Sequence, residues 1–202
     1  AAWEFNGDLK STVGNLPLKS SGNVTFKDGQ VVLNRGFLES PKLPIDLKAK
    51  TLEVWFSIPN LDQRGGGVMG TQGPGDFFDT IVLGERQNRH WISGSNGFAR
   101  TLDFPGSTPE TAVNQPIHLA MVYLEDGTTL LYRNGVPYGK PFRRNRATFP
   151  KNQTSIIFGL RHKPAGGNKY LNVSIDKARL YNRPLNAEEV AASASGNNLF
   201  IT

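Results

Sequence analysis

Residues 117–138 read IHLAMVYLEDGTTLLYRNGVPY and predict three short antiparallel strands joined by two tight turns. Apolar side chains alternate from Ile117 to Tyr123, as in a strand that buries one face. Asp126-Gly127 and Asn134-Gly135 follow at the two places where the alternation stops. Both dipeptides favour type I′ turns, whose two central residues need positive φ. This meander indicates an all-β sandwich, so any chemistry would lie on a sheet face or in loops.

The rest of the chain also has turn signals between strand-like segments, at intervals of roughly ten residues. The glycine-rich stretch at residues 65–75 lacks the lysine and the following helix of a phosphate-binding loop, and we expect a long hairpin loop there. One short helix is predicted over residues 187–194, because Asn186 and Glu189 have the spacing of a capping box. The other expected strands cover residues 24–26, 30–33, 52–58, 80–83, 90–93, 155–159 and 171–180.

The composition excludes several classes of protein and of functional site. The 202 residues contain no cysteine, which excludes disulfides, thiolate zinc sites and cysteine nucleophiles. No apolar run approaches the roughly 20 residues of a membrane helix. Ala1-Ala2-Trp3 has neither the charged nor the apolar region of a signal peptide. We expect one domain over residues 1–202, excised from a larger protein or processed after export to the periplasm, the cell surface or the medium.

The net charge of +6 arises from 23 basic and 17 acidic residues. Such a surface favours polyanions, including nucleic acid, anionic lipid and sulfated or carboxylated polysaccharide, and simple solubility is the alternative explanation. The basic residues are dispersed among acidic ones and no nucleic-acid-binding module is recognisable. We therefore expect neither a nucleic-acid nor a membrane partner.

Two ordered sets of motifs together cover nearly the whole chain. The first set is residues 3–5 (WEF), 51–56 (TLEVWF), 118–123 (HLAMVY), 126–128 (DGT), 132–135 (YRNG) and 175–190 (IDKARLYNRPLNAEEV); the second is 63–69 (QRGGGVM), 78–86 (FDTIVLGER), 91–95 (WISGS) and 158–162 (FGLRH). The first set resembles the laminin G-like, concanavalin A-like lectin/glucanase superfamily. The second is similar to the version found in large multidomain proteins of planctomycete bacteria, beside cytochrome-c-like domains.

The resemblance implies a two-sheet antiparallel jelly-roll sandwich with one concave face and a short C-terminal helix. Members of the superfamily mostly bind glycans, sometimes through calcium, while some are glycosidases and some bind proteins. Related sandwiches often tie the N-terminal segment to the last strand through calcium. By this resemblance Asp176 would hold a structural calcium ion, with Asp8 as a plausible partner; two ordinary surface aspartates are the alternative.

The residues do not favour an enzyme. Glycosidases of this fold carry a Glu-x-Asp-x-x-Glu run, which the chain lacks. Asp79 and Glu85 would lie about 20 Å apart along a strand, whereas retaining catalysis needs about 5 Å. The three histidines form no helix-spaced metal pair, and His118 is expected to be structural.

Carbohydrate recognition needs flat aromatics and planar polar side chains, and anionic sugars add arginine. Residues 85–100 supply all of these, although Trp91 could equally be a core residue. Tyr138 with Arg143 and Arg144, and Arg161 with His162, could join Arg86 at one rim of the concave face; scattered solvated arginines are the alternative. The candidate ligand-binding residues are Arg86, His90, Trp91, Arg100, Tyr138, Arg161 and His162.

These observations indicate a non-catalytic, lectin-like carbohydrate-binding module that targets a larger protein to a polysaccharide, with anionic and sulfated polysaccharides among the candidates. The alternative is a protein-interaction or assembly domain of a multidomain bacterial protein.

Overall fold

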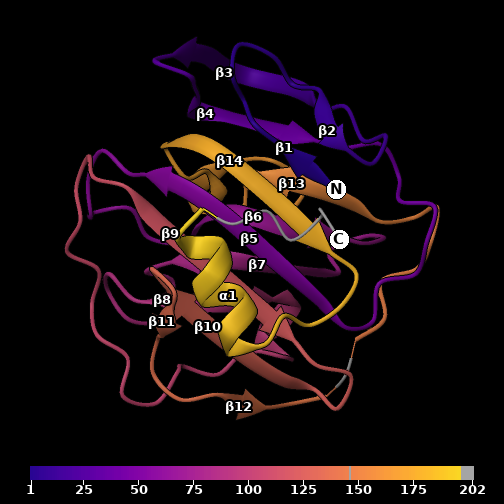
Figure 1. Cartoon of the computed structure of the whole chain (residues 1–202), viewed down its shortest axis with the longest axis vertical. Coiled ribbons are helices and arrows are strands. Elements are labelled where there is room, and N and C mark those ends of the chain that lie inside the picture. The colour runs from indigo at the N-terminus through magenta and orange to yellow at the C-terminus, as the bar shows by residue number, and fades with distance from the viewer. Residues whose placement is uncertain (146, 197–202) are drawn as a thin grey trace.

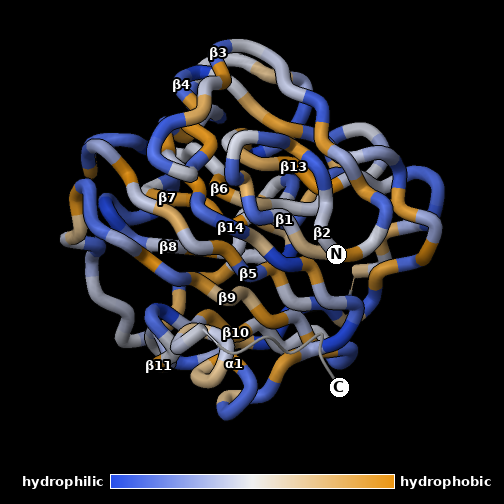
Figure 2. The backbone as a smooth tube through the Cα atoms, turned by 45° about the horizontal axis from the view of Figure 1, so that its top comes forward, coloured by the Kyte–Doolittle hydropathy of each residue, from blue (hydrophilic) through white to orange (hydrophobic). Residues whose placement is uncertain are grey.

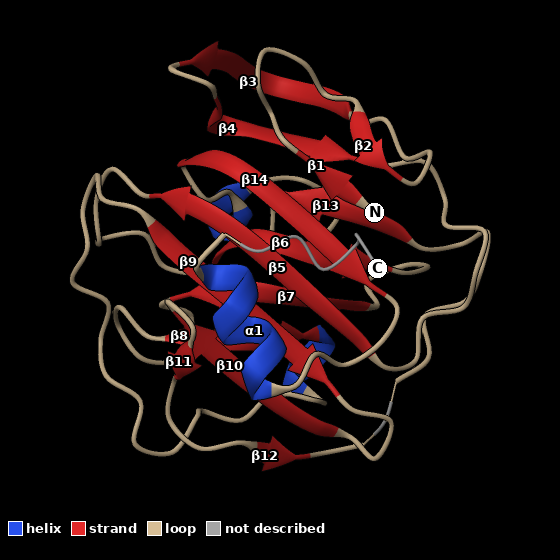
Figure 3. Cartoon of the chain, viewed as in Figure 1, coloured by secondary structure: helices blue, strands red, loops and turns tan. Residues whose placement is uncertain are grey.

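The computed structural model describes residues 1–145 and 147–196, and most of the regular secondary structure in this part of the chain is antiparallel β-strand (Figure 3). In chain order the strands are β1 (Ala2–Trp3), β2 (Ser11–Val13), β3 (Lys19–Lys27), β4 (Gln30–Glu39), β5 (Lys50–Ser57), β6 (Gly66–Gln72), β7 (Phe78–Leu83), β8 (Trp91–Ser95), β9 (Ile117–Tyr123), β10 (Thr128–Arg133), β11 (Val136–Pro137), β12 (Phe142–Arg143), β13 (Ser155–Phe158) and β14 (Val173–Tyr181). Two 3-10 turns, η1 (Asn96–Phe98) and η2 (Gly167–Lys169), and one helix, α1 (Ala187–Ala194), complete the described elements.

The strands form two layers (Figure 1). One has the order β11-β10-β9-β5-β14 and the other the order β13-β6-β7-β8. Strand β4 connects them, because its residues 31–33 pair with β14 and its residues 38–39 pair with β13. The predicted two-sheet antiparallel sandwich with one short C-terminal helix is confirmed.

The core lies between the layers and follows from strand alternation. Leu52, Val54 and Phe56 of β5 point inward, as do Ile81 and Leu83 of β7, and all five are at most 1% exposed. Burying each such side chain contributes about 1.5–3 kcal/mol. Figure 2 shows the hydrophobic residues along the central strands and hydrophilic ones in the peripheral loops.

The two turns of the central meander differ. Asn134 and Gly135 both have positive φ, 51° and 82°, so the predicted type I′ turn is confirmed there. The expectation of a second type I′ turn at Asp126-Gly127 is wrong, because only Gly127 has positive φ, at 91°. Leu124 accepts a hydrogen bond from the Gly127 amide and donates to the Thr128 carbonyl, which makes a longer loop that ends in a left-handed glycine.

The hairpin loop expected at residues 65–75 is also wrong. Most of this stretch is β6, a fully buried strand between β13 and β7. Its glycines allow a close approach of neighbouring chain: a Cβ on Gly70 would lie 2.0 Å from Thr80 Oγ1, and one on Gly67 would lie 2.7 Å from the Arg161 Cα. Glycine here serves packing, which composition alone does not distinguish from a loop.

The C-terminal helix forms as predicted. The Asn186 side chain accepts from the Glu189 amide at 2.8 Å, and the Glu189 carboxylate accepts from the Asn186 amide at 3.0 Å. Val190 packs α1 onto the outer face of the β9 layer, against Val122, Tyr132 and Tyr181 (Figure 1). No helix among the described residues is long and apolar enough to span a bilayer.

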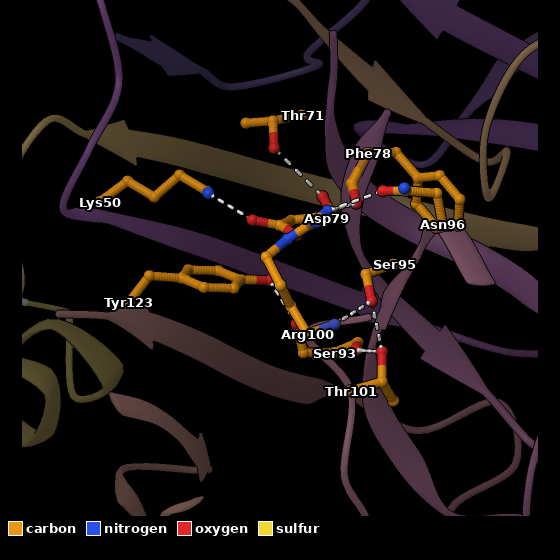
Figure 4. Close-up of polar contacts among 10 residues, drawn as sticks. All are labelled: Lys50, Thr71, Phe78, Asp79, Ser93, Ser95, Asn96, Arg100, Thr101 and Tyr123. Atoms are coloured by element: carbon orange, nitrogen blue, oxygen red, sulfur yellow. Dashed lines mark hydrogen bonds and ion pairs between the residues drawn. The ribbon is translucent and has the colours of Figure 1, made fainter. Parts of the chain in front are cut away.

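A buried charge cluster joins the two layers (Figure 4). Asp79 of β7 accepts from Lys50 Nζ of β5 at 2.7 Å and from Arg100 Nε at 3.0 Å. The Lys50 ammonium also lies 4.1 Å from the centroid of the Tyr123 ring. Burial lowers the pKa of Lys50 even though Asp79 stabilises its charge. Removing one partner of such a cluster leaves an uncompensated buried charge.

A second buried carboxylate orders the loop before β9. Glu110 accepts from Trp91 Nε1 at 2.9 Å, from Arg133 at 2.8 and 2.7 Å, and from the amides of Thr111 and Ala112. Burial raises the pKa of the Glu110 carboxyl, but the hydrogen bonds from Arg133, Trp91 and Ala112 outweigh burial and hold that pKa below its usual value.

Replacing Asp79 by Ala should lower the free energy of unfolding by about 3–5 kcal/mol, because Lys50 and Arg100 would stay buried without a counter-charge. Urea denaturation measures the loss. The matched control, Asp103→Ala, removes the more exposed ion pair with Arg86 and should cost less than about 1 kcal/mol. Equal losses for the two variants would contradict this role of Asp79.

Glu110 should make stability fall in acid. Its folded pKa lies below the ordinary 4.5, so its contribution is complete above pH 4.5 and is lost as pH falls through the lower folded pKa. Urea denaturation at stepped pH measures the free energy of unfolding. Below pH 4.5 this free energy should fall less steeply with decreasing pH for Glu110→Gln than for the natural chain. Glu189→Gln, at an exposed helix cap, serves as the control and should change this pH dependence less. The same pH dependence for the Glu110 variant and the natural chain would refute the prediction.

Candidate functional site

Two of the predicted ligand-binding residues, Arg161 and His162, line a small polar cleft of about 120 Å³. It lies on the outer face of the layer that contains β6, β7 and β8, opposite the face covered by α1. We call it the Arg161 cleft. The residues that line it are Asp76, Phe78, Glu85, Ser95, Asn96, Gly97, Phe98, Arg161 and His162.

Strand alternation and two short connections position these side chains. On β7, Asp79 points into the core, so its neighbour Phe78 faces outward. The His162 ring stacks on Phe78, with centroids 4.4 Å apart and an interplanar angle of 18°. The 3-10 turn η1, directly after β8, brings Asn96 and Phe98 to the same place.

Arg161 is held rigidly from three sides. Its Nη1 lies 2.9 Å from the Glu85 carboxylate and donates to the Gly65 carbonyl at 2.9 Å. Its own carbonyl accepts from Thr80 Oγ1 at 2.7 Å. Burial raises the pKa of the Glu85 carboxyl above its usual value despite the adjacent guanidinium. The ion pair is therefore preorganised, with little side-chain entropy left to lose on binding.

His162 is a neutral hydrogen-bonding group. Its Nδ1 lies 2.9 Å from the Lys163 carbonyl, an acceptor, so Nδ1 carries the proton and Nε2 is left as an acceptor. Burial lowers the pKa of His162 below the ordinary 6.5, and the neighbouring Lys169 and Arg161 charges lower it further. The ring therefore adds no charge to the cleft near neutral pH.

Phe98 provides the flat aromatic surface of the cleft. It is 37% exposed and has a positive φ of 54°. The Arg86 guanidinium lies 5.2 Å from the centroid of its ring, within cation–π range. Arg86 also pairs with Asp103 at 3.0 Å. Arg86 therefore supports the aromatic platform at the edge of the cleft.

Arg100 supports the cleft from inside. Besides its bond to Asp79, its Nη2 donates to the Asn96 side chain at 2.9 Å and to the Phe78 carbonyl at 2.8 Å (Figure 4). Arg100 therefore fixes two residues that line the cleft and does not itself line it.

The structure contradicts the prediction for Trp91 and Tyr138, and it does not place His90 in the Arg161 cleft. Trp91 is fully buried and Tyr138 is 5% exposed, and the Tyr138 hydroxyl accepts from the Trp91 amide. Neither ring can stack on a ligand, because both belong to the core. His90 lies 3.1 Å from Ser107 Oγ and does not line the cleft. Arg143 donates to the Asp126 carbonyl beyond β10, so the expected rim that included Tyr138 and Arg143 does not form.

Sequence reasoning missed Phe98, Asn96 and Asp76 as site residues. The signal for the first two is weak, because Asn-Gly favours a turn wherever it occurs. Asp76 lies at the turn before β7, and its sequence context does not distinguish it from other acidic surface residues.

Neither predicted calcium ligand, Asp8 or Asp176, belongs to a cluster of acidic or histidine side chains among the described residues. Asp8 is exposed and accepts from the Lys10 amide at 2.9 Å, and Asp176 is exposed on β14. The described residues contain no group of three or more His, Asp or Glu side chains that could hold a metal ion. A calcium ion there would depend largely on carbonyl oxygens, and the site stays a prediction.

The cleft has little net positive potential. Arg86, Arg100 and Arg161 each lie within 3.0 Å of a carboxylate oxygen, on Asp103, Asp79 and Glu85 respectively. These three arginines are thus compensated by aspartate and glutamate.

Comparisons with solved structures show the same architecture. Domain 4 of AbnA, an extracellular GH43 arabinanase from Geobacillus stearothermophilus solved with arabinotriose, is 20% identical with a TM-score of 0.77, over 96% of this chain and 97% of that domain. The binding domain of botulinum neurotoxin serotype G is 15% identical with a TM-score of 0.67, over 96% of this chain and 50% of that one. Trypanosoma rangeli sialidase is 17% identical with a TM-score of 0.63, over 89% of this chain and 29% of the sialidase chain.

These identities establish the fold only, and the chain spans half or less of the last two proteins. No curated protein sequence matches the chain. The model of the concanavalin A-like lectin/glucanases superfamily matches residues 27–191, which is most of the chain and includes every residue of the Arg161 cleft. The chain therefore belongs to the concanavalin A-like lectin/glucanase superfamily, as its motifs predicted.

Proposed function

We propose that this chain is a non-catalytic carbohydrate-binding module and that the Arg161 cleft binds a sugar residue of a polysaccharide. The observation that carries the proposal is a rigid polar cleft beside the exposed ring of Phe98. The similarity to an arabinanase domain solved with arabinotriose and to a toxin binding domain supports it. Such a module would keep the rest of a larger, exported protein close to its polysaccharide.

The cleft offers the groups that a sugar needs. Phe98 can cover an apolar C–H face of the ring. Asp76 can accept hydrogen bonds from hydroxyls, the Asn96 amide nitrogen can donate one, and His162 Nε2 can accept one. The Glu85–Arg161 pair closes one wall and is already formed without ligand, so binding costs little reorganisation.

A neutral glycan fits the cleft better than an anionic one. A sulfate or uronate would need an uncompensated cation, whereas Arg86, Arg100 and Arg161 are all paired with carboxylates. Asp76 and Glu85 would also repel a ligand anion. Anionic and sulfated polysaccharides are therefore the second candidates. The salt dependence of the affinity distinguishes them from neutral glycans.

A binding role suits these carboxylates better than catalysis. A retaining glycosidase needs two free carboxyl groups about 5 Å apart, one as acid and one as nucleophile. In the cleft, the Glu85 carboxylate is engaged by Arg161, and Asp76 is exposed at a turn. This arrangement supports recognition of hydroxyls rather than bond cleavage.

Assembly with other domains is the second candidate function. One observation favours it: a mainly apolar groove of about 640 Å³ at the edge of the sandwich, where Ile45 is 40% exposed. Apolar grooves of this size often contact another protein surface. Its lining includes Leu16, Pro41, Leu43, Pro44, Ile45, Leu47 and Leu180.

Phe98→Ala should weaken glycan binding about threefold to tenfold, because the cleft loses its aromatic platform. Affinity gels with arabinan, xylan, mannan and β-glucan identify the polysaccharide, and calorimetry with its oligosaccharides measures the change. Phe26→Ala, which truncates a similarly exposed ring on β3, is the matched control and should bind like the natural chain. Lack of retention on any gel by the natural chain would overturn the function, and equal affinity of both variants would overturn the site.

Salt separates the two classes of glycan. Affinity for a neutral polysaccharide should be nearly unchanged between about 50 mM and about 500 mM NaCl, because no net charge is neutralised on binding. A steep loss of affinity over the same range, with retention on heparin or pectin gels, would show instead that the ligand is anionic.

A further inference from the structure

A second groove, of about 480 Å³, lies on the opposite outer face of the sandwich, beside the C-terminal end of α1. Its walls come from β5, from the start of β9, from the Asn134-Gly135 turn and from α1. None of these residues lines the Arg161 cleft. We call it the Trp55 groove, after the aromatic residue that lines it. The residues used below are Trp55, His118 and Asn134.

Trp55 is the one tryptophan of three that reaches the surface. Trp3 and Trp91 are fully buried, whereas Trp55 is partly exposed on the outer face of β5. Its cross-strand neighbours are His118 of β9 and Lys177 of β14. The Trp55 and His118 ring centroids lie 4.7 Å apart, and Lys177 Nζ and the Arg179 guanidinium lie 4.8 and 5.0 Å from the centroid of the Trp55 ring. These contacts hold the indole in place, and its exposed part lines the groove.

His118 offers an unused acceptor there. The side chain is 4% exposed, and its Nε2 lies 2.8 Å from Glu53 Oε1. Glu53 also accepts from the Tyr181 hydroxyl, at 3.2 Å. Because a carboxylate only accepts, Nε2 carries the proton and Nδ1 of the neutral ring has a free lone pair. Nδ1 has no hydrogen-bond partner among the described residues, which is rare for a buried polar atom.

Asn134 supplies a complementary donor. Its Oδ1 accepts from the His118 amide at 2.9 Å, so Nδ2 remains to donate from a side chain that is exposed and lines the groove. The groove thus combines a flat ring, a buried acceptor and an exposed donor. The C–H face and the adjacent hydroxyls of a sugar ring match this set.

We propose that the Trp55 groove is a second saccharide-binding site, specific for a neutral sugar that stacks on Trp55 and donates one hydroxyl hydrogen to His118 Nδ1. Because Nδ1 is buried, this hydrogen bond requires the turn at Asn134 to move. The two sites occupy opposite faces of the sandwich, so one module can hold two glycan segments. The proposal stands on residues separate from those of the Arg161 cleft.

Tryptophan fluorescence tests this site selectively, because Trp55 is the exposed tryptophan and the Arg161 cleft contains none. The folded chain is titrated with arabinotriose, xylotriose, mannotriose and cellotriose in turn. We expect a saturable change in emission with at least one of them. Phe98→Ala should leave that change intact, which separates failure of this site from failure of the cleft.

Two conservative variants test the hydrogen bonds. His118→Gln keeps a donor toward Glu53 but removes the acceptor at Nδ1, and Asn134→Asp keeps the acceptor for the His118 amide but removes the donor. Each should weaken the fluorescence-detected binding about tenfold at an unchanged melting temperature. No emission change with any trisaccharide at millimolar concentration would mean that only water meets Nδ1 and would overturn the proposal. Natural affinity in both variants would also overturn it.

Discussion

The buried Asp79 carboxylate connects the core to the surface. It accepts hydrogen bonds from Lys50 of the opposite layer and from Arg100. Arg100 in turn holds Asn96 and the Phe78 carbonyl, two components of the Arg161 cleft. A carboxylate in the interior must be paired, so its position fixes the distance between the layers and the geometry of the 3-10 turn η1. The lining of the Arg161 cleft is thus anchored by a charge buried in the core.

Many basic side chains are paired with carboxylates, so the positive net charge does not produce a cationic site at the Arg161 cleft. The chain carries a net charge of +6, yet the arginines around the cleft each meet a carboxylate, and Arg133 is held by the buried Glu110. These pairs order loops at the ends of strands, where a sandwich has few backbone hydrogen bonds to do so. Rigid loops favour recognition of a weakly interacting ligand such as a sugar, because little entropy is lost on binding.

Different segments of the chain cover the two outer faces of the sandwich. Helix α1 covers part of the β9 layer and leaves the Trp55 groove at its end, while residues 159–171 fold back over β6 and β7 and create the Arg161 cleft. In both places an outward aromatic of a strand, Trp55 or Phe78, meets a histidine from a neighbouring segment. The superfamily fold therefore presents aromatic and polar groups on both sides.

The sequence by itself determined the fold class, the type I′ turn at Asn134-Gly135 and the capped helix, because these depend on alternation, on positive φ and on spacing within a few residues. It also identified Arg161 and His162 as surface candidates. The tertiary structure decided which side chains face the core, so Trp91 on β8 proved to be buried and Phe98 in η1 exposed. It also decided that residues 66–72 form a central strand and that the arginines are paired. Those outcomes depend on contacts between segments far apart in the chain, which local pattern does not encode.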